Sequence, residues 1–154
     1  MPIINCIKAN FARATIRNCS EQNCKLRLDG LSNFIILKGE RICKNRKICD
    51  CIIFIVKNCI IIGIVELKSK TVHAKEVVKK LYNGSVTALH ILKKCSNKEI
   101  KKEFYHLVLC KGWSSSSEYI KLTKKEKIII EGKRYNIIPK RCGISFSALI
   151  STLK

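Results

Sequence analysis

Apolar residues along the chain gather into short runs rich in isoleucine and valine, and polar breaks separate these runs. Runs of this length and composition predict buried strands, because a helix needs a longer stretch of periodic pattern. A further hairpin, turning at Glu131-Gly132, is expected over residues 127–143. The four strands expected before it are "NFIILKGE" (33–40), "ICDCIIFIV" (48–56), "CIIIGIVELK" (59–68) and "FYHLVLCKG" (104–112).

Three segments have the spacing of helices instead. Residues 71–92 place Val77, Val78, Leu81 and Tyr82 on one helical face, and Gly84 weakens the middle, where the helix would divide in two. A short basic helix is expected over residues 9–20 and another over the tail "ISFSALISTL". The basic stretch "RICKNRK" (41–47) and the polar stretch "WSSSSEY" (113–119) are expected to be loops.

The expected order is therefore helix, three strands, helix, strand and late hairpin, which indicates the α/β (α+β) class. The length of 154 residues suits one domain. We expect a single domain over residues 1–154, with its core at about residues 33–112 and a C-terminal hairpin and tail over 120–154. No internal repeat is visible.

The net charge of the chain limits the classes of binding partner that we expect. Lysine and arginine number 31 against 11 aspartates and glutamates, which gives a net charge of +20. So large an excess attracts polyanions, either nucleic acid or an anionic membrane surface. Nucleic acid is favoured, with DNA before RNA and no membrane partner, because lysine and arginine contacts to phosphate dominate its binding. The alternative is an AT-rich coding bias, which inflates lysine in every protein of a genome.

The chain carries no recognisable export or membrane segment. Its start lacks an unbroken apolar stretch, and "CIIIGIV" is far shorter than the roughly 20 residues of a membrane helix. We therefore expect an intracellular, cytoplasmic protein that is not secreted; a transit peptide at the basic start is the alternative.

The ten cysteines include no C-x-x-C pair, so structural zinc or an iron–sulfur cluster is not expected. Most of them are expected to be scattered thiols, with disulfides as the alternative if the source is a hyperthermophile.

Two carboxylates stand out in the apolar strands. Glu66 and Lys68 share one face of a strand because alternate side chains do so. If the hairpin turns at Lys57-Asn58, residues whose numbers sum to about 115 or 116 lie opposite each other, and Asp50 falls near Val65 or Glu66. Two carboxylates at a sheet end suit a hard divalent cation, Mg²⁺ or Mn²⁺.

Such a site predicts phosphodiester hydrolysis. A bound divalent ion activates water and polarises a phosphoryl oxygen, and Lys68 lies beside it to orient that water or stabilise the charge of the transition state. The alternative for a lone E-x-K is an ion pair where a strand emerges into solvent. The preceding apolar strand, Asp50 on its neighbour, the following helix and the basic charge together favour the catalytic interpretation.

This pattern resembles the PD-(D/E)XK nuclease superfamily, which includes many restriction enzymes and archaeal Holliday-junction resolvases. The resemblance covers about residues 33–92 and lies in "ICDCIIF", "IVELKSK" and the helix that follows. It implies a restriction-endonuclease-like αβββαβ core with a mixed central sheet flanked by helices. It also implies that Asp50 and Glu66 are metal ligands and that Lys68 is the catalytic lysine.

The chain departs from the family pattern at three places. Cys49 stands where many members have proline. A further acid near the first helix is represented only by Glu40 or Glu21. Some members have a glutamine in the helix after E-x-K, where this chain has lysines. These departures leave open a degenerate site.

Basic residues around the expected site are candidates for nucleic-acid binding, although a solvated helix face is the alternative for the lysines. They are Lys70, His73, Lys75, Lys79, Lys80, Lys140 and Arg141.

The resulting prediction is a magnesium-dependent endonuclease, for which a homodimer is a possible state. Two other classes compete with it: a non-catalytic nucleic-acid-binding protein of nuclease-like fold, and a metal-binding regulator organised by the cysteines.

Overall fold

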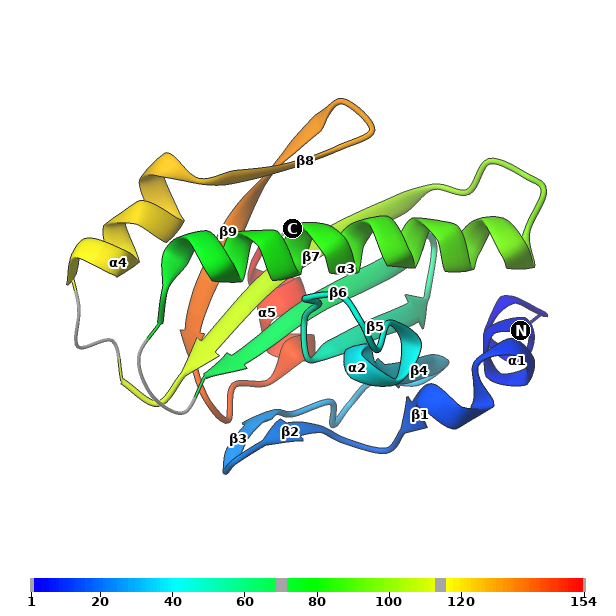
Figure 1. The fold of residues 1–154 in the computed structure, drawn as a ribbon. Coiled ribbons are helices and arrows are strands. Elements are labelled where there is room, and N and C mark those ends of the chain that lie inside the picture. The colour runs from blue at the N-terminus through cyan, green and yellow to red at the C-terminus, as the bar shows by residue number, and fades with distance from the viewer. Residues whose placement is uncertain (1, 69–71, 113–115, 154) are drawn as a thin grey trace.

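The middle layer of the molecule is a mixed seven-stranded sheet in the order β1-β4-β5-β6-β7-β9-β8 (Figure 1). The structure is a computed structural model that describes residues 2–68, 72–112 and 116–153. Strands β4, β5 and β6 form an antiparallel meander, whereas β7 runs parallel to β6 and β9 parallel to β7. The strands of the sheet are β1 (Thr15–Ile16), β4 (Phe34–Lys38), β5 (Cys51–Val56), β6 (Ile60–Lys68), β7 (Lys102–Cys110), β8 (Lys127–Ile130) and β9 (Lys133–Arg141).

Helices cover both faces of this sheet. The long helix α3 (Ala74–Cys95) crosses one face, and α5 (Phe146–Leu153) lies against the other (Figure 1). A two-stranded ribbon of β2 (Cys19–Glu21) and β3 (Cys24–Leu26) packs on the α5 side. The remaining helical segments are α1 (Pro2–Asn10), η1 (Ala12–Ala14), α2 (Gly39–Ile42), α4 (Ser116–Ile120) and the π-helical turn η2 (Lys121–Lys125).

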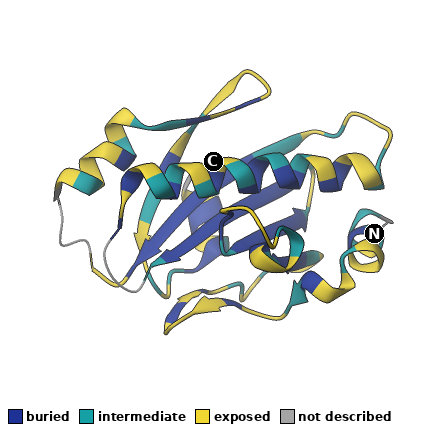
Figure 2. Cartoon of the chain, viewed as in Figure 1, coloured by how far each residue is buried: buried dark blue, intermediate teal, exposed yellow. Residues whose placement is uncertain are grey.

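Strands β5 and β6 are buried on both faces, which is why they read as continuous apolar runs (Figure 2). Along β6, Ile62 and Ile64 pack into the core under α3. Their neighbours Ile61 and Val65 pack into the second core under α5. By this alternation Glu66 belongs to the row that faces α3.

The mixed α/β architecture predicted from the sequence is confirmed, as are the four strands and the late hairpin. Its turn is at Glu131 and Gly132, whose φ angles are 50° and 80°. Both central residues of a type I′ hairpin turn need such positive values. The helix expected over the tail forms as α5.

Several expectations about local structure are wrong. The N-terminal helix spans Pro2–Asn10 rather than residues 9–20, because Ile3, Ile4 and Ile7 give it an apolar face that packs on the core. The segment expected to be a polar loop at 113–119 is helical from Ser116 onward.

Helix α3 is also continuous through Gly84, where a division was expected. A Cβ at Gly84 would overlap Cys49 Sγ, so the glycine serves close packing rather than a break.

The cysteines differ most from expectation. Six of the ten, all within the described ranges, form disulfides rather than thiols: Cys6–Cys95, Cys19–Cys51 and Cys24–Cys142. Cys43, Cys49, Cys59 and Cys110 carry thiols. The bonds tie α1 to the end of α3, and they fasten the β2–β3 ribbon to β5 and to the residue after β9.

Within the described residues, every helix is too short or too polar to cross a lipid bilayer.

Candidate active site

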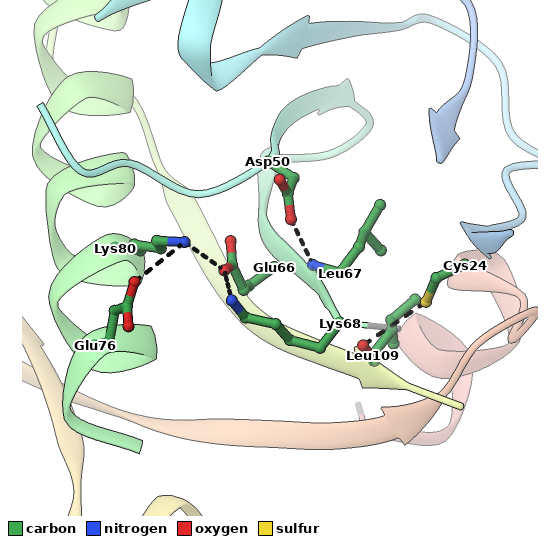
Figure 3. A network of polar contacts seen from close by, with 8 residues as sticks. All are labelled: Cys24, Asp50, Glu66, Leu67, Lys68, Glu76, Lys80 and Leu109. Atoms are coloured by element: carbon green, nitrogen blue, oxygen red, sulfur yellow. Dashed lines mark hydrogen bonds and ion pairs between the residues drawn. The ribbon is translucent and has the colours of Figure 1, made fainter. Parts of the chain in front are cut away.

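The β5–β6 hairpin brings Asp50 beside Glu66. Partners run from Cys51↔Val65 to Val56↔Ile60, so the numbers of each pair sum to 116 and the predicted register is confirmed. Asp50 immediately precedes β5. Because Cys51 is paired with Val65, Asp50 lies next to Glu66. Its Oδ2 accepts a hydrogen bond of 2.7 Å from the backbone N–H of Leu67 (Figure 3).

The segment that leads into Asp50 is anchored on both sides. The N–H of Gly39 donates to the Asp50 carbonyl at 2.9 Å. The Asn83 side chain, on α3, donates to the Lys47 carbonyl at 2.6 Å. Cys49 is buried and fills the space left by Gly84. These contacts place the Asp50 carboxylate by backbone and packing, independently of any ligand.

Glu66 is a charged residue in an almost fully buried position, because its side chain is only 1% exposed. Its Oε2 lies 3.2 Å from Lys68 Nζ and 3.2 Å from Lys80 Nζ. Lys80 reaches it from α3 and also lies 3.8 Å from Glu76 Oε1 (Figure 3). Lys68 and Lys80 therefore approach the same oxygen from the strand and from the helix.

The other oxygen of Glu66 has no such partner. Among the described residues, Glu66 Oε1 is one of two buried side-chain oxygen or nitrogen atoms without a hydrogen bond. Leaving an acceptor buried and unsatisfied is unfavourable, typically by about 1–3 kcal/mol. A cation or a donor that reaches Oε1 would remove this penalty.

The pKa of Asp50 is also raised by its surroundings. Burial first, and the neighbouring Glu66 carboxylate second, raise the pKa of Asp50 to about 7, although the Leu67 N–H acts in the opposite direction. Burial alone would lower the pKa of Lys80, but Glu66 raises it above its ordinary value. Among the described residues, the lysines thus pair with Glu66 Oε2, whereas Glu66 Oε1 and the Asp50 carboxylate form no ion pair.

This arrangement fits a hard divalent cation held by Asp50 and Glu66. Magnesium binds through one or two carboxylates and retains several waters, so two protein ligands are sufficient. In the part of the chain that the structure describes, no group of three or more histidine, cysteine, aspartate or glutamate side chains is placed to hold a metal ion.

The tentative further acids do not join the pair. Lys38 Nζ lies 3.9 Å from Glu21 and 3.2 Å from Glu40, so both acids are engaged by this lysine. Glu21 and Asp50 do line one pocket, and the charge of Glu21 contributes weakly to the raised pKa of Asp50.

The structure separates the predicted nucleic-acid-binding residues. Lys80 lies in the site itself. Lys75 and Lys79 are exposed on α3, and His73 is exposed just before it. Arg141 is level with Cys110, which is level with Lys68, so Arg141 lies in the same row across the ends of β9, β7 and β6.

Lys140 is not part of that surface. It pairs with Leu109, whose side chain lies in the core under α5, so Lys140 extends from the opposite face of the sheet. Lys70 lies outside the described residues.

The sequence pattern missed two features of the site. Lys80 was expected to contact nucleic acid rather than Glu66. The available signal was its place in the helix after E-x-K, where some nucleases of the resembled superfamily have glutamine. The basic stretch 41–47 was expected to be only a loop, yet it borders Asp50. Its proximity to Asp50 in sequence was the available signal.

Comparisons of the chain with protein-family models, with curated proteins and with solved structures found no match.

Proposed function

We propose that the chain is a metal-dependent nuclease that hydrolyses phosphodiester bonds of nucleic acid, with DNA the favoured substrate and Mg²⁺ or Mn²⁺ the cofactor. The observation that carries this proposal is the carboxylate pair of Asp50 and Glu66 beside Lys68, with Glu66 Oε1 buried and lacking a donor. The resemblance to the PD-(D/E)XK superfamily supports the same assignment of roles.

Asp50 and Glu66 would hold the cation, which, when bound, supplies a Lewis acid and lowers the pKa of a coordinated water. Lys68 is the catalytic lysine in this proposal. Its ammonium group lies at the rim of the site, with the side chain 23% exposed, so it can reach a phosphate oxygen and stabilise the charge that develops there. Lys80 is a positioning residue that fixes the orientation of Glu66, and Glu76 in turn holds Lys80.

Cleavage assays test the proposal directly. Supercoiled plasmid, linear duplex and four-way-junction DNA are incubated with the protein in Mg²⁺ and in Mn²⁺. We expect cleavage that falls by roughly 100-fold or more in Asp50→Asn, Glu66→Gln and Lys68→Met, as for the loss of other groups that act on the transition state. Lys93→Met, which changes an exposed lysine near the other end of α3, is the matched control. Absence of cleavage of all three substrates in both metals would contradict the proposal.

A second candidate function is a nucleic-acid-binding protein without catalysis. The observation that favours it is the presence of two ammonium groups on Glu66 Oε2, which neutralise much of the charge that a cation would otherwise bind. The melting temperature distinguishes the two functions, since a ligand that binds only the folded state raises it. A nuclease site should be stabilised by Mg²⁺ or Mn²⁺ in the wild type and not in Asp50→Asn, whereas a binding protein should show no difference between them.

A further inference from the structure

A groove of about 240 Å³ opens beside Asp50, between residues 38–50 and Lys80 in the first half of α3. Asp50 and Lys80 are among its lining residues, so the groove adjoins the candidate site. Its other polar lining is almost entirely basic. The charged side chains that line it are Lys38, Glu40, Lys44, Arg46, Lys47, Asp50 and Lys80.

The cations of this groove differ in how they are compensated. Lys38 and Lys80 are paired with glutamates. Lys44, Arg46 and Lys47 are exposed, and within the described residues none of them forms an ion pair with a carboxylate. Three adjacent positive charges without a protein counter-charge favour an anionic partner from outside the chain.

The backbone that carries these three residues is anchored. Asn83 holds the Lys47 carbonyl at 2.6 Å, and the N–H of Cys43 donates to the Gly39 carbonyl at 3.0 Å. Ile48 and Cys49, directly after them, are buried, whereas positions 44–47 are exposed. The charges therefore project from a segment that is held by a hydrogen bond at each end, which reduces the ordering needed when a ligand binds.

We propose that this basic groove, defined by Lys44, Arg46 and Lys47, binds the phosphate backbone of the nucleic acid whose scissile phosphate lies at Asp50 and Glu66. The inference rests on the proposed function and adds the path of the substrate: the strand runs from the carboxylate pair past Lys80 and along the basic segment before β5. Contacts of this kind position the substrate without reading its sequence.

Nucleic acid fits this groove better than a membrane surface does. The groove is concave, and the acidic side chains of Glu40 and Asp50 are part of its lining. These carboxylates would repel anionic lipid headgroups. A phosphodiester backbone can follow a concave path and, at the carboxylates, can share a divalent cation with them.

The test measures binding without cleavage, so that it does not depend on catalysis. All proteins carry Asp50→Asn, and EDTA is present. Fluorescence anisotropy gives the dissociation constant for a labelled duplex and for the corresponding single strand at several salt concentrations. The groove variant is Lys44→Gln/Arg46→Gln/Lys47→Gln.

The matched control variant is Lys93→Gln/Lys98→Gln/Lys101→Gln. It removes the same three charges from exposed positions toward the other end of α3 and the start of β7, where, among the described residues, the three lysines also lack ion pairs. From Lys80 to Lys93 the helix rises by about 20 Å, so the two sets are well separated. Circular dichroism and melting temperature check that both variants are folded.

We expect the groove variant to weaken binding at least tenfold at moderate salt, with the slope of log K against log salt reduced in magnitude by about 2–3. The control should change affinity by less than about threefold. Equal weakening in both variants, or no weakening in the groove variant, would overturn the proposal. So would loss of binding to phosphatidylserine vesicles with DNA affinity unchanged, since the groove would then serve a membrane.

The outcomes also separate this inference from the proposed function. If the wild type cleaves DNA and the groove variant binds normally, the proposed nuclease activity is supported and the proposed binding groove is contradicted. If the wild type never cleaves but only the groove variant loses binding, the proposed binding groove is supported and the proposed nuclease activity is contradicted.

Discussion

At the scale of single residues, the carboxylate pair stands out because its arrangement opposes stability. Glu66 is buried with one oxygen unsatisfied, and Asp50 is kept beside it by the Leu67 N–H and the hairpin register. Groups that would be more stable apart are typical of functional sites, where stability is lost in favour of activity.

Replacing Asp50 with asparagine should therefore stabilise the protein at pH 8 in the absence of metal. The pKa of Asp50 is raised from 3.8 to about 7 by burial and by Glu66. The folded state then holds a proton that the unfolded state releases between about pH 4 and 7, so this group makes stability fall as the pH rises through that window. Asparagine keeps an acceptor for the Leu67 N–H. We expect Asp50→Asn to unfold with a free energy about 1–3 kcal/mol higher at pH 8, by urea titration.

A control is the same comparison at pH 4, where wild-type Asp50 is largely protonated in the folded state and the difference between the two proteins should shrink. An Asp50→Asn protein that is less stable than the wild type at pH 8 would show that the carboxylate is stabilised by its surroundings after all.

His106 should give a pH dependence of the opposite sign. It is buried in β7, its Nε2 lies 2.7 Å from Ser85 Oγ, and burial lowers its pKa from 6.5 to about 3. Below about pH 6.5, His106 is protonated in the unfolded state but stays neutral in the folded state. The free energy of unfolding therefore falls as the pH drops. Between pH 7 and 5 this amounts to about 2 kcal/mol. His106→Gln should remove this contribution to the slope, measured by urea unfolding at both pH values.

Because Asp50 and His106 act in opposite directions over the same window, the wild-type profile alone is uninformative. The slope of Asp50→Asn should therefore be compared with that of the His106→Gln/Asp50→Asn double variant, because these two proteins differ only at His106. His90→Gln, at an exposed helix position, is the control and should leave the profile unchanged. A slope between pH 7 and 5 that is the same with and without His106 would contradict the assignment.

At the scale of elements, the packing of α3 on the segment before β5 decides where Asp50 lies. Gly84 allows Cys49 Sγ to enter the space that a Cβ would occupy. Alanine is normally favoured over glycine in a helix by about 1 kcal/mol. Here that gain is outweighed, because a Cβ at position 84 would overlap the buried Cys49 Sγ.

We expect Gly84→Ala to destabilise the protein by about 1–3 kcal/mol, as other cases of overpacking do. Cys49→Ala should offset much of this loss, so the double variant should be more stable than the sum of the single changes by about 1 kcal/mol. Chemical unfolding of the four proteins of the cycle measures the coupling. Tyr82→Ala, two positions away on the exposed face, is the control. Additive single changes would indicate that the helix shifts and that Cys49 is not confined by it.

Much of the site follows from short-range pattern. The turn between β5 and β6 is short, and strand alternation is rigid, so the register and the pairing of Asp50 with Glu66 could be predicted from residues 48–68 alone. The position of Lys80 could not, because it depends on how α3 crosses the sheet. At the start of α3, the N–H of Ala74 donates a hydrogen bond of 3.2 Å to Glu118, which lies 44 residues later in the chain.

At the scale of the whole molecule, three disulfides join parts of the chain that are 89, 32 and 118 residues apart. Cross-links over such separations restrict the unfolded chain strongly. Two of them hold the β2–β3 ribbon against the sheet, where it covers part of the core under α5.

The disulfides predict a thiol count. Of ten cysteines six are bonded, so 10 − 6 = 4 should react with a thiol reagent in denaturant without reductant, and ten after reduction. Reduction should lower the free energy of unfolding by several kcal/mol, since each bond of this kind contributes about 2–4 kcal/mol. Cys59→Ser, which removes a thiol outside the disulfides, should lower the first count to three and leave the effect of reduction unchanged. Ten reactive thiols before reduction would contradict the assignment.

The sequence by itself determined the mixed α/β class, the hairpin of β5 and β6 and the adjacency of Asp50 and Glu66, because alternation and short turns act over a few residues. Only the tertiary structure decided that Lys80 meets Glu66, that Gly84 makes room for Cys49 and that six cysteines pair. It also placed the basic segment 44–47 beside the candidate site. These features depend on contacts between distant segments, and such contacts leave no periodic trace in the chain.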